Sequence, residues 1–305
     1  MTSYPLSEQM TAFVEKTVSF NSTDTSLAGL RQAYSEMCRA FTPPRPEGLY
    51  VVDFDLAGVA VRSYQSHASP STDACPCIVY LHGGGWVVGD LDSHDFICAE
   101  LASTLGVLVI AVDYRLAPEH PFPAGFDDCL KVWRALRTGP FRLDPERTLV
   151  MGDSAGGNLA AALCLALRDA HEPLPAAQVL IYPGLGGGQQ LPSRSECLDA
   201  PLLSSSDVDC YHALYLRGSR QPGTYAMPLF AGHFGGLPPA LIAVAQFDPL
   251  RDDGVQYAEL LEAAGVDTTL YYGEGLVHGC LRARGQAAEV DALYETLLGF
   301  LADRV

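Results

Sequence analysis

Apolar residues along the chain follow two spacings, which alternate from about residue 77 onward. Short apolar runs without polar alternation predict strands that are buried on both faces of a sheet. Such strands are predicted at residues 77–81, 107–112, 148–151, 178–182, 240–245 and 268–271. Apolar residues at helical spacing predict helices at residues 96–105, 126–136, 158–170 and 287–301. This alternation predicts an α/β protein with a mostly parallel sheet and helices on both faces.

The N-terminal part of the chain shows a different order of elements. Two helices are predicted at residues 11–20 and 26–41, and two strands follow at residues 50–54 and 59–64. The proline-rich segment 42–46 ends the second helix, because proline cannot continue a helix ladder. Ala57-Gly58 lies between the two strands and predicts a hairpin turn. With this hairpin, the sheet is expected to have about eight strands.

The segment between Pro183 and Leu237 interrupts the alternation, because it contains no predicted sheet strand. Within it, residues 204–216 have helical spacing. Ligands bind outside the carboxyl ends of parallel strands. We therefore expect an insertion at about 184–236 to form a cap over that edge, joined by the helices of residues 1–45. The alternative is a surface insertion without a role in binding.

Composition and charge narrow the range of partners. The chain has 305 residues, 48% of them hydrophobic, and a net charge of −17 with a pI near 4.7. These values describe a globular protein with a large core. The negative charge disfavours nucleic acid and anionic membrane surfaces as partners and favours a neutral small molecule. A role of the acidic residues in solubility alone explains the same net charge equally well. No apolar stretch reaches bilayer length, so no stable membrane association is expected, and homo-oligomerisation is left open.

The nine cysteines and eight histidines do not indicate a metal site or a disulfide framework. The cysteines are scattered, odd in number and without a C-x-x-C pair, so free thiols in a reducing cytoplasm are expected. The histidines lack the H-E-x-x-H spacing of zinc sites, and no metal site is predicted. The first ten residues lack the basic and apolar regions of a secretory signal, which also favours a cytoplasmic location.

Two glycine-rich turns follow predicted strands, HGGGW at 82–86 and GDSAGG at 152–157. The second fits the nucleophile elbow G-x-S-x-G, a strand-to-helix turn that exposes a serine. Gly152 and Gly156 are required there because the backbone approaches neighbouring strands closely. The first turn can aim backbone N–H groups at one point, as an oxyanion hole requires. Ser154 is therefore the candidate nucleophile.

A serine nucleophile needs a histidine base, which follows the serine in this arrangement. Four histidines follow Ser154. His171 ends the helix after the elbow, His212 lies in the predicted cap helix and His233 lies in a glycine-rich loop. His278 lies just after the last predicted strand, where a side chain can reach the elbow. We therefore predict that His278 is the base.

The orienting acid is expected at the carboxyl end of the preceding strand. Asp248 is the first acid after the strand predicted at 240–245. Asp252 and Asp253 are alternatives, but they begin the next helix, where acids are common because they complement the helix dipole. We therefore prefer Asp248, whose carboxylate would fix the histidine tautomer.

These segments resemble the hormone-sensitive-lipase-like esterases, also called bacterial family IV carboxylesterases. The matching segments are HGGGW at 82–86, DYRLAPEHPFPA at 113–124, GDSAGG at 152–157, DPLRDDG at 248–254 and HG at 278–279. The resemblance implies an α/β-hydrolase fold with a helical cap, no cofactor, and hydrolysis of short-chain acyl esters. Residues 46–305 would then form the catalytic domain that carries the cap insertion.

The resemblance also implies roles for individual residues. The triad would be Ser154, Asp248 and His278, the oxyanion hole would use the amides of Gly83, Gly84 and Ala155, and Trp86 would line the acyl pocket. His82 would hold its loop, Asp153 would support the site, and Arg115, Glu119 and Asp128 would form a buried polar network. A second pocket wall is expected from apolar cap residues Leu202, Leu203, Leu214 and Leu216, leaving room for acyl chains of roughly two to six carbons.

Two positions depart from the family pattern. Gln246-Phe247 precede Asp248 where the family often has a glycine, and Cys280 follows the final His-Gly where an aromatic residue is common.

Two alternative functions remain. An amide, formamide or lactone hydrolase could use the same triad and is the first of them. A receptor on the same scaffold is a more remote one, because plant gibberellin receptors resemble this family but lack the catalytic histidine that is present here.

Overall fold

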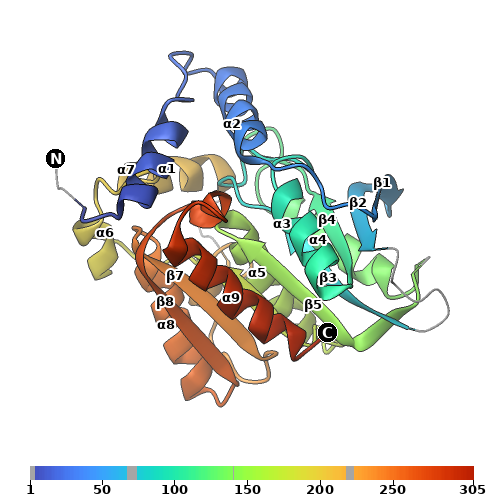
Figure 1. Cartoon of the computed structure of the whole chain (residues 1–305). Coiled ribbons are helices and arrows are strands. Elements are labelled where there is room, and N and C mark those ends of the chain that lie inside the picture. Colours follow the sequence, from blue (N-terminus) through green and yellow to red (C-terminus); the bar gives the residue numbers. More distant parts are fainter. Residues whose placement is uncertain (1–3, 67–73, 140, 218–222) are drawn as a thin grey trace.

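The computed structural model describes residues 4–66, 74–139, 141–217 and 223–305, and a single sheet forms its centre (Figure 1). The sheet has eight strands in the order β1-β2-β4-β3-β5-β6-β7-β8. The strands are β1 (Leu49–Leu56), β2 (Val59–Ser66), β3 (Cys75–Leu81), β4 (Leu108–Asp113), β5 (Leu143–Asp153), β6 (Gln178–Ile181), β7 (Ala240–Phe247) and β8 (Thr268–Val277). The β1–β2 hairpin is antiparallel and joins β4 in antiparallel register, and all other pairs are parallel. The expected mostly parallel sheet is confirmed.

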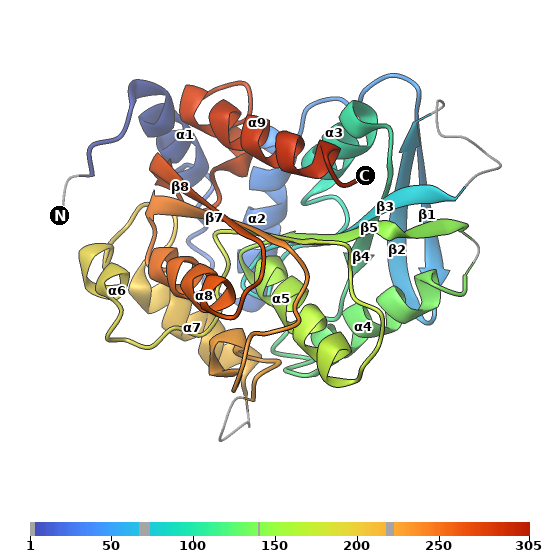
Figure 2. The same cartoon turned by 90° about the horizontal axis from the view of Figure 1, so that it is seen from below.

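Helices cover both faces of this sheet, as Figure 2 shows. One face carries α3 (Asp95–Leu105) and α9 (Ala288–Ala302), and the other carries α4 (Ala124–Leu136), α5 (Ala155–Asp169) and α8 (Arg251–Ala263). Alternate strand residues serve two separate cores. Val79 of β3 packs with residues of α4 and α5, whereas Ile78 and Tyr80 pack with residues of α3 and α9. Because both faces are buried, the central strands are continuously apolar.

The remaining α-helices gather at one end of the sheet, where β5 leads into α5 (Figure 1). They are α1 (Glu8–Val18), α2 (Leu27–Phe41), α6 (Pro192–Glu196) and α7 (Ser205–Tyr215), and two short 3-10 helices are η1 (Pro228–Phe230) and η2 (Cys280–Ala283). α1, α2 and α7 each begin after a serine whose hydroxyl accepts a backbone N–H three residues later. Such N-caps satisfy one of the free amides of the first turn. None of the described helices is both long and apolar enough to cross a membrane.

The last strand is longer than the sequence pattern predicts. β8 continues to Val277 instead of ending at residue 271, although it contains Gly273 and Gly275. Gly275 has φ +73°, a conformation that favours glycine. Its N–H donates to the side-chain oxygen of Gln246 at 2.7 Å, beside an irregularity in the β7–β8 pairing. Gln246, one of the departures from the family pattern, therefore holds the end of the strand that leads to His278.

Candidate active site

Ser154 lies on a tight turn between β5 and α5, with φ +53°. The turn depends on two glycines that lie against neighbouring backbone. A Cβ at Gly156 would lie 1.9 Å from the carbonyl oxygen of Leu81, and a Cβ at Gly152 would lie 2.4 Å from Gly156 itself. Because backbone atoms cannot rotate away as a side chain can, both positions require glycine. The elbow is therefore fixed by contact between its own backbone and β3.

Three sequence-predicted residues meet at this turn. His278 Nε2 lies 2.9 Å from Ser154 Oγ, and His278 Nδ1 lies 2.7 Å from Asp248 Oδ2. Asp248 is fully buried, and its Oδ1 accepts the backbone N–H of Leu250 at 2.8 Å. Phe247 pairs with Val277 at the ends of β7 and β8, so the next residue of each strand, Asp248 and His278, lie side by side. The arrangement orients the imidazole between an acid and a hydroxyl.

The alternative histidines do not reach Ser154. His171 and His233 are exposed, outside the cavity that contains Ser154. His212 of α7 does line that cavity, and its ring packs 5.7 Å from the ring of Trp86. Burial, together with the charge of Arg194, lowers the pKa of His212 to about 4. His212 is thus a neutral part of the cavity wall.

The alternative acids serve the segment after β6 instead. Asp253 forms a buried ion pair with Arg194 at 2.6 Å and accepts the backbone N–H groups of Leu185 and Gly187 at 2.9 and 3.0 Å. Asp252 accepts the backbone N–H of Ser193 at 2.7 Å. Both carboxylates therefore fasten the start of the predicted cap insertion to α8.

The glycine turn after β3 differs from the expectation at Gly83. Its N–H donates to Asp153 Oδ1 at 3.0 Å and is thus already engaged within the protein. No described residue accepts a hydrogen bond from the N–H of Gly84 or of Ala155, and both residues line the cavity beside Ser154. Gly84 has φ +125°, and a Cβ there would lie 2.1 Å from the carbonyl oxygen of Val88. Of the three expected donors, the amides of Gly84 and Ala155 are therefore free, and the N–H of Gly85, which also lines the cavity, has no described acceptor either.

Asp153, which precedes the serine, contacts several members of a buried polar cluster. Besides Gly83, its carboxylate accepts the hydroxyl of Tyr80 at 2.9 Å and lies 3.2 Å from His94 Nε2. Burial by itself would raise the pKa of Asp153, but His94 and the charge of Arg282 lower it to about 2. The carboxylate is therefore ionised at neutral pH and joins the glycine turn to the elbow.

His82, at the start of the glycine turn, is also buried. Its Nδ1 lies 2.7 Å from the carbonyl oxygen of Gly83, and its ring stacks on Tyr114 at 4.3 Å. Burial and the neighbouring His94 lower the pKa of His82 to about 3. The residue packs against Tyr114, which follows β4, and lies outside the lining of the cavity.

The expected network of Arg115, Glu119 and Asp128 forms only in part. Arg115 pairs with the buried Asp128 at 2.7 Å, but the Arg115 side chain is itself exposed, and Glu119 pairs with Arg31 of α2, at 2.8 Å, near the surface. Of the three residues only Asp128 is buried, so the prediction of a buried network is wrong for Arg115 and Glu119. Their proximity in sequence suggested one cluster, but Arg115 contacts α4 and Glu119 contacts α2.

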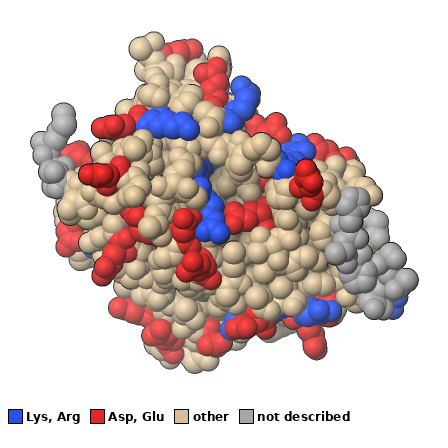
Figure 3. All heavy atoms as spheres, viewed as in Figure 1, with Lys and Arg blue, Asp and Glu red and all other residues tan. Residues whose placement is uncertain are grey.

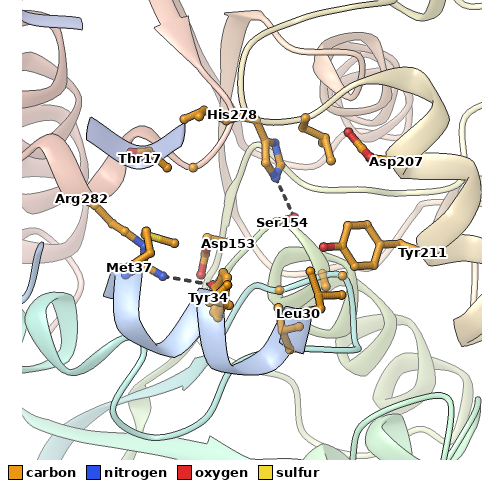
Figure 4. Close-up of a pocket in the computed structure, with 18 of the residues that line it drawn as sticks. Thr17, Leu30, Tyr34, Met37, Asp153, Ser154, Asp207, Tyr211, His278 and Arg282 are labelled. Atoms are coloured by element: carbon orange, nitrogen blue, oxygen red, sulfur yellow. Dashed lines mark hydrogen bonds between the residues drawn. The ribbon is translucent and has the colours of Figure 1, made fainter. Parts of the chain in front are cut away.

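A cavity of about 860 Å³ opens above Ser154 (Figure 4). In this view Tyr211 and Asp207 of α7 face the serine from one side, and Leu30, Tyr34 and Met37 of α2 lie below it. The walls are mostly apolar, and α1, α2 and α7 all contribute to them. A substrate at Ser154 would thus contact both the N-terminal helices and the insertion after β6.

Trp86 lies on this wall and is 4% exposed. Its ring stacks on Tyr215 of α7 at 4.2 Å with planes 7° apart. Leu202 and Leu203 also line the cavity, as predicted. Leu214 and Leu216 do not, because α7 turns Tyr211 and Val208 toward the cavity and leaves these two leucines packed against other apolar residues.

Comparison with known proteins places the chain in a family. Residues 78–282 match the model of a family described as having the alpha/beta hydrolase fold. The chain is 39% identical over 293 residues to an esterase, LipI, of Mycobacterium tuberculosis, a match that covers 93% of this chain and 90% of that protein. It is 41% identical to the carboxylesterase NlhH of the same species, with 85% of each chain covered.

A solved structure gives the same result. An esterase from the bacterial hormone-sensitive lipase family superposes with a TM-score of 0.86 at 28% identity, covering 100% of this chain and 99% of that chain. The chain therefore belongs to the alpha/beta hydrolase family, in its branch of hormone-sensitive-lipase-like esterases.

Proposed function

We propose that this carboxylic ester hydrolase is a serine esterase that cleaves short-chain acyl esters through an acyl-enzyme intermediate. The observation that carries the proposal is the hydrogen-bonded series Asp248–His278–Ser154, which ends on a hydroxyl beside a mostly apolar cavity. A serine hydroxyl is a poor nucleophile unless a base removes its proton, and His278 Nε2 is within reach of that proton.

In the first half of the reaction, Ser154 Oγ attacks the ester carbonyl while His278 accepts its proton. Asp248 holds the N–H of His278 on Nδ1 and stabilises the imidazolium that forms. The negative charge that develops on the carbonyl oxygen is stabilised by the amides of Gly84 and Ala155. In this assignment Gly83 supports the oxyanion hole through Asp153 and does not contribute a donor.

The tetrahedral intermediate then collapses, the alcohol leaves with the proton from His278, and the acyl group stays on Ser154. In the second half, water attacks the acyl-enzyme with His278 again as the base, and His278 returns this proton to Ser154 Oγ as the acid is released. His278 therefore acts alternately as base and acid from one position.

We propose that residues 1–45 and about 184–236 act together as a cap on the catalytic domain of residues 46–305. The lining of the cavity by α1, α2 and α7 supports this role. Trp86, Leu202 and Leu203 would bound the acyl group, with a preference for roughly two to six carbons. The acidic side chains spread over the face shown in Figure 3, and the net charge of −17, favour an uncharged ester over an anionic substrate.

The test is a hydrolysis panel with the wild type and Ser154→Ala. The panel contains p-nitrophenyl esters of increasing acyl length, an aryl formamide and a lactone. We expect the short-chain esters to be cleaved fastest, Ser154→Ala to be inactive yet folded, and an organophosphate to label Ser154 alone. Near wild-type turnover by Ser154→Ala would overturn the mechanism, and faster cleavage of the formamide or lactone would change the substrate class.

A further inference from the structure

The two residues that follow the glycine turn, Val87 and Val88, connect it to a side chain from the N-terminal region. The backbone N–H groups of Val87 and Val88 both donate to the carbonyl oxygen of Gly84 at 3.0 Å. The carbonyl oxygen of Val87 in turn accepts Nε of Arg31 at 2.9 Å. Arg31 belongs to α2, more than fifty positions earlier in the chain. One short series of contacts thus leads from α2 to the carbonyl oxygen of Gly84, in the peptide that joins Gly84 to Gly85.

The same guanidinium also contacts a third segment. It donates to the carbonyl oxygen of Ala117 at 3.1 Å and forms two hydrogen bonds with Glu119, both 2.8 Å long. Ala117 donates its own N–H to the carbonyl oxygen of Trp86 at 2.8 Å. A planar guanidinium can make such contacts at once, because its five donors have a fixed geometry.

Apolar packing beneath the guanidinium joins the same elements. Val87, Val88 and Ala117 form a small buried cluster, separate from the two main cores, with Leu27 and Tyr34 of α2 and with Tyr211 and Leu214 of α7 packed against it. Tyr34 and Tyr211 also line the cavity. Two helices that line the cavity therefore pack against the residues that follow the glycine turn.

We propose that Arg31 is a positioning residue for the oxyanion hole: it ties α2 to the glycine turn and keeps the N–H of Gly84 aimed at the reacting carbonyl. The inference rests on the proposed function, because it takes the Gly84 amide as an oxyanion donor. The turn can transmit a shift at Val87, since Gly84 is tightly packed against the backbone of Val88. Arg31 contacts no reacting atom, and its effect passes through the backbone.

The ion pair with Glu119 is the lesser part of this contact. The side chains of Arg31 and Glu119 are 32% and 49% exposed, and ion pairs at such sites contribute little stability. The two backbone carbonyl contacts are only partly exposed and are the ones that touch the turn. Removing Glu119 should therefore leave the turn in place, whereas removing Arg31 should release it.

The experiment compares Arg31→Met, Arg31→Lys and Glu119→Gln with the wild type. A matched control is Arg134→Met, which removes a similarly exposed arginine that pairs with Glu172 away from the cavity. For each variant, kcat and KM are measured with p-nitrophenyl butyrate, and the inhibition constant is measured with a trifluoromethyl ketone, which mimics the tetrahedral intermediate. Thermal melting and titration with a phosphonate report folding and the fraction of reactive Ser154.

We expect Arg31→Met to lower kcat roughly tenfold, less than the ~10²-fold that loss of a whole oxyanion donor costs. Its affinity for the trifluoromethyl ketone should fall by the same factor, while KM changes less than twofold. Arg31→Lys should show part of this loss, since lysine cannot span all three acceptors. Glu119→Gln and Arg134→Met should keep the wild-type kcat.

Three results would overturn the inference. They are an unchanged kcat in Arg31→Met, a loss that appears only in KM, or an equal loss of kcat in Glu119→Gln. If Arg31→Met does not fold, the same comparison is made with Arg31→Lys, for which an unchanged kcat and inhibitor affinity count against the inference. Failure of the proposed function shows differently, as activity that survives Ser154→Ala in an otherwise wild-type chain.

Discussion

The nucleophile elbow and the α7 wall of the cavity face the same space, but they are specified in different ways. At the elbow, a Cβ on Gly152 or Gly156 would overlap backbone atoms, so no residue other than glycine fits there. At the α7 wall, a Cβ on Gly85 would meet the ring of Tyr211, a side chain that can turn. Chemistry at Ser154 thus depends on backbone that cannot shift, whereas the substrate wall depends on which side chains a helix presents.

This difference separates two kinds of substitution. Changes at the elbow and its partners should alter turnover or folding as a whole, because each position has one structural solution. Changes in the wall should alter which substrate is preferred and leave the chemistry in place. The four predictions below test this contrast, from the largest expected effect to the smallest.

Asp248→Asn should lower kcat by about 10⁴-fold, because an amide favours the wrong tautomer of the histidine. Asp252→Asn should change kcat little, and Asp253→Asn should mainly lower stability, since its carboxylate pairs with the buried Arg194. Steady-state kinetics and thermal melting separate the two effects. Similar losses of kcat in all three variants would remove the assignment of Asp248 as the orienting acid.

Gly156→Ala should destabilise the fold by about 3 kcal/mol or more, because its Cβ would overlap the backbone of β3. The matched variant is Gly232→Ala in the insertion, where a Cβ would have no atom within 4 Å. Its effect should stay within about 0.5 kcal/mol. Urea unfolding measures both. A mild effect at Gly156 would mean that β3 can move away from the elbow.

Acid should lower the free energy of unfolding, because His82 is buried in its neutral form beside the glycine turn. The pKa of His82 is about 3 in the folded protein, below the ordinary value of 6.5, so the folded state favours the neutral ring. Its contribution to stability is complete above pH 6.5 and is lost as the pH falls toward 3, because only the unfolded chain binds the proton. At roughly 1.4 kcal/mol per pH unit, about 3 kcal/mol is lost by pH 4.

Urea unfolding between pH 8 and pH 4 checks this prediction. His82→Gln should be less stable at pH 8 but lose less stability on acidification than the wild type. His171→Gln, which alters an exposed histidine, should follow the wild-type curve. A parallel slope in His82→Gln and the wild type would show that other groups cause the acid sensitivity.

Trp86→Ala should shift the preferred acyl chain to greater length, because it removes the ring that spans the cavity wall between Gly184 and Tyr215. Each methylene that gains a buried site adds ~0.8 kcal/mol, or about fourfold in kcat/KM. Leu214→Ala should leave the optimum unchanged, since Leu214 lies outside the lining. A wild-type preference for long-chain triglycerides at an oil surface would contradict the proposed preference for short acyl chains.

Local sequence pattern was sufficient where one short segment determines the outcome. The alternation of apolar strands and amphipathic helices predicted the sheet, and the glycine turns predicted where Ser154 would lie. The order along the chain and the ends of the strands also identified Asp248 and His278 as the pair expected beside it. These features depend on the period of a segment and on the steric needs of a turn, and both can be read from neighbouring residues.

Contacts between distant segments were decided only by the tertiary structure. The extension of β8 depends on Gln246 of the adjacent strand, and the engagement of the Gly83 amide depends on Asp153, which lies 70 positions later. Arg31 reaches Val87 from α2. Periodicity shows that a helix has an apolar face, but it does not show which neighbour that face meets or which polar group finds a partner. Those outcomes follow from how all the elements pack together, because each buried polar group takes the partner that the packed chain brings within reach.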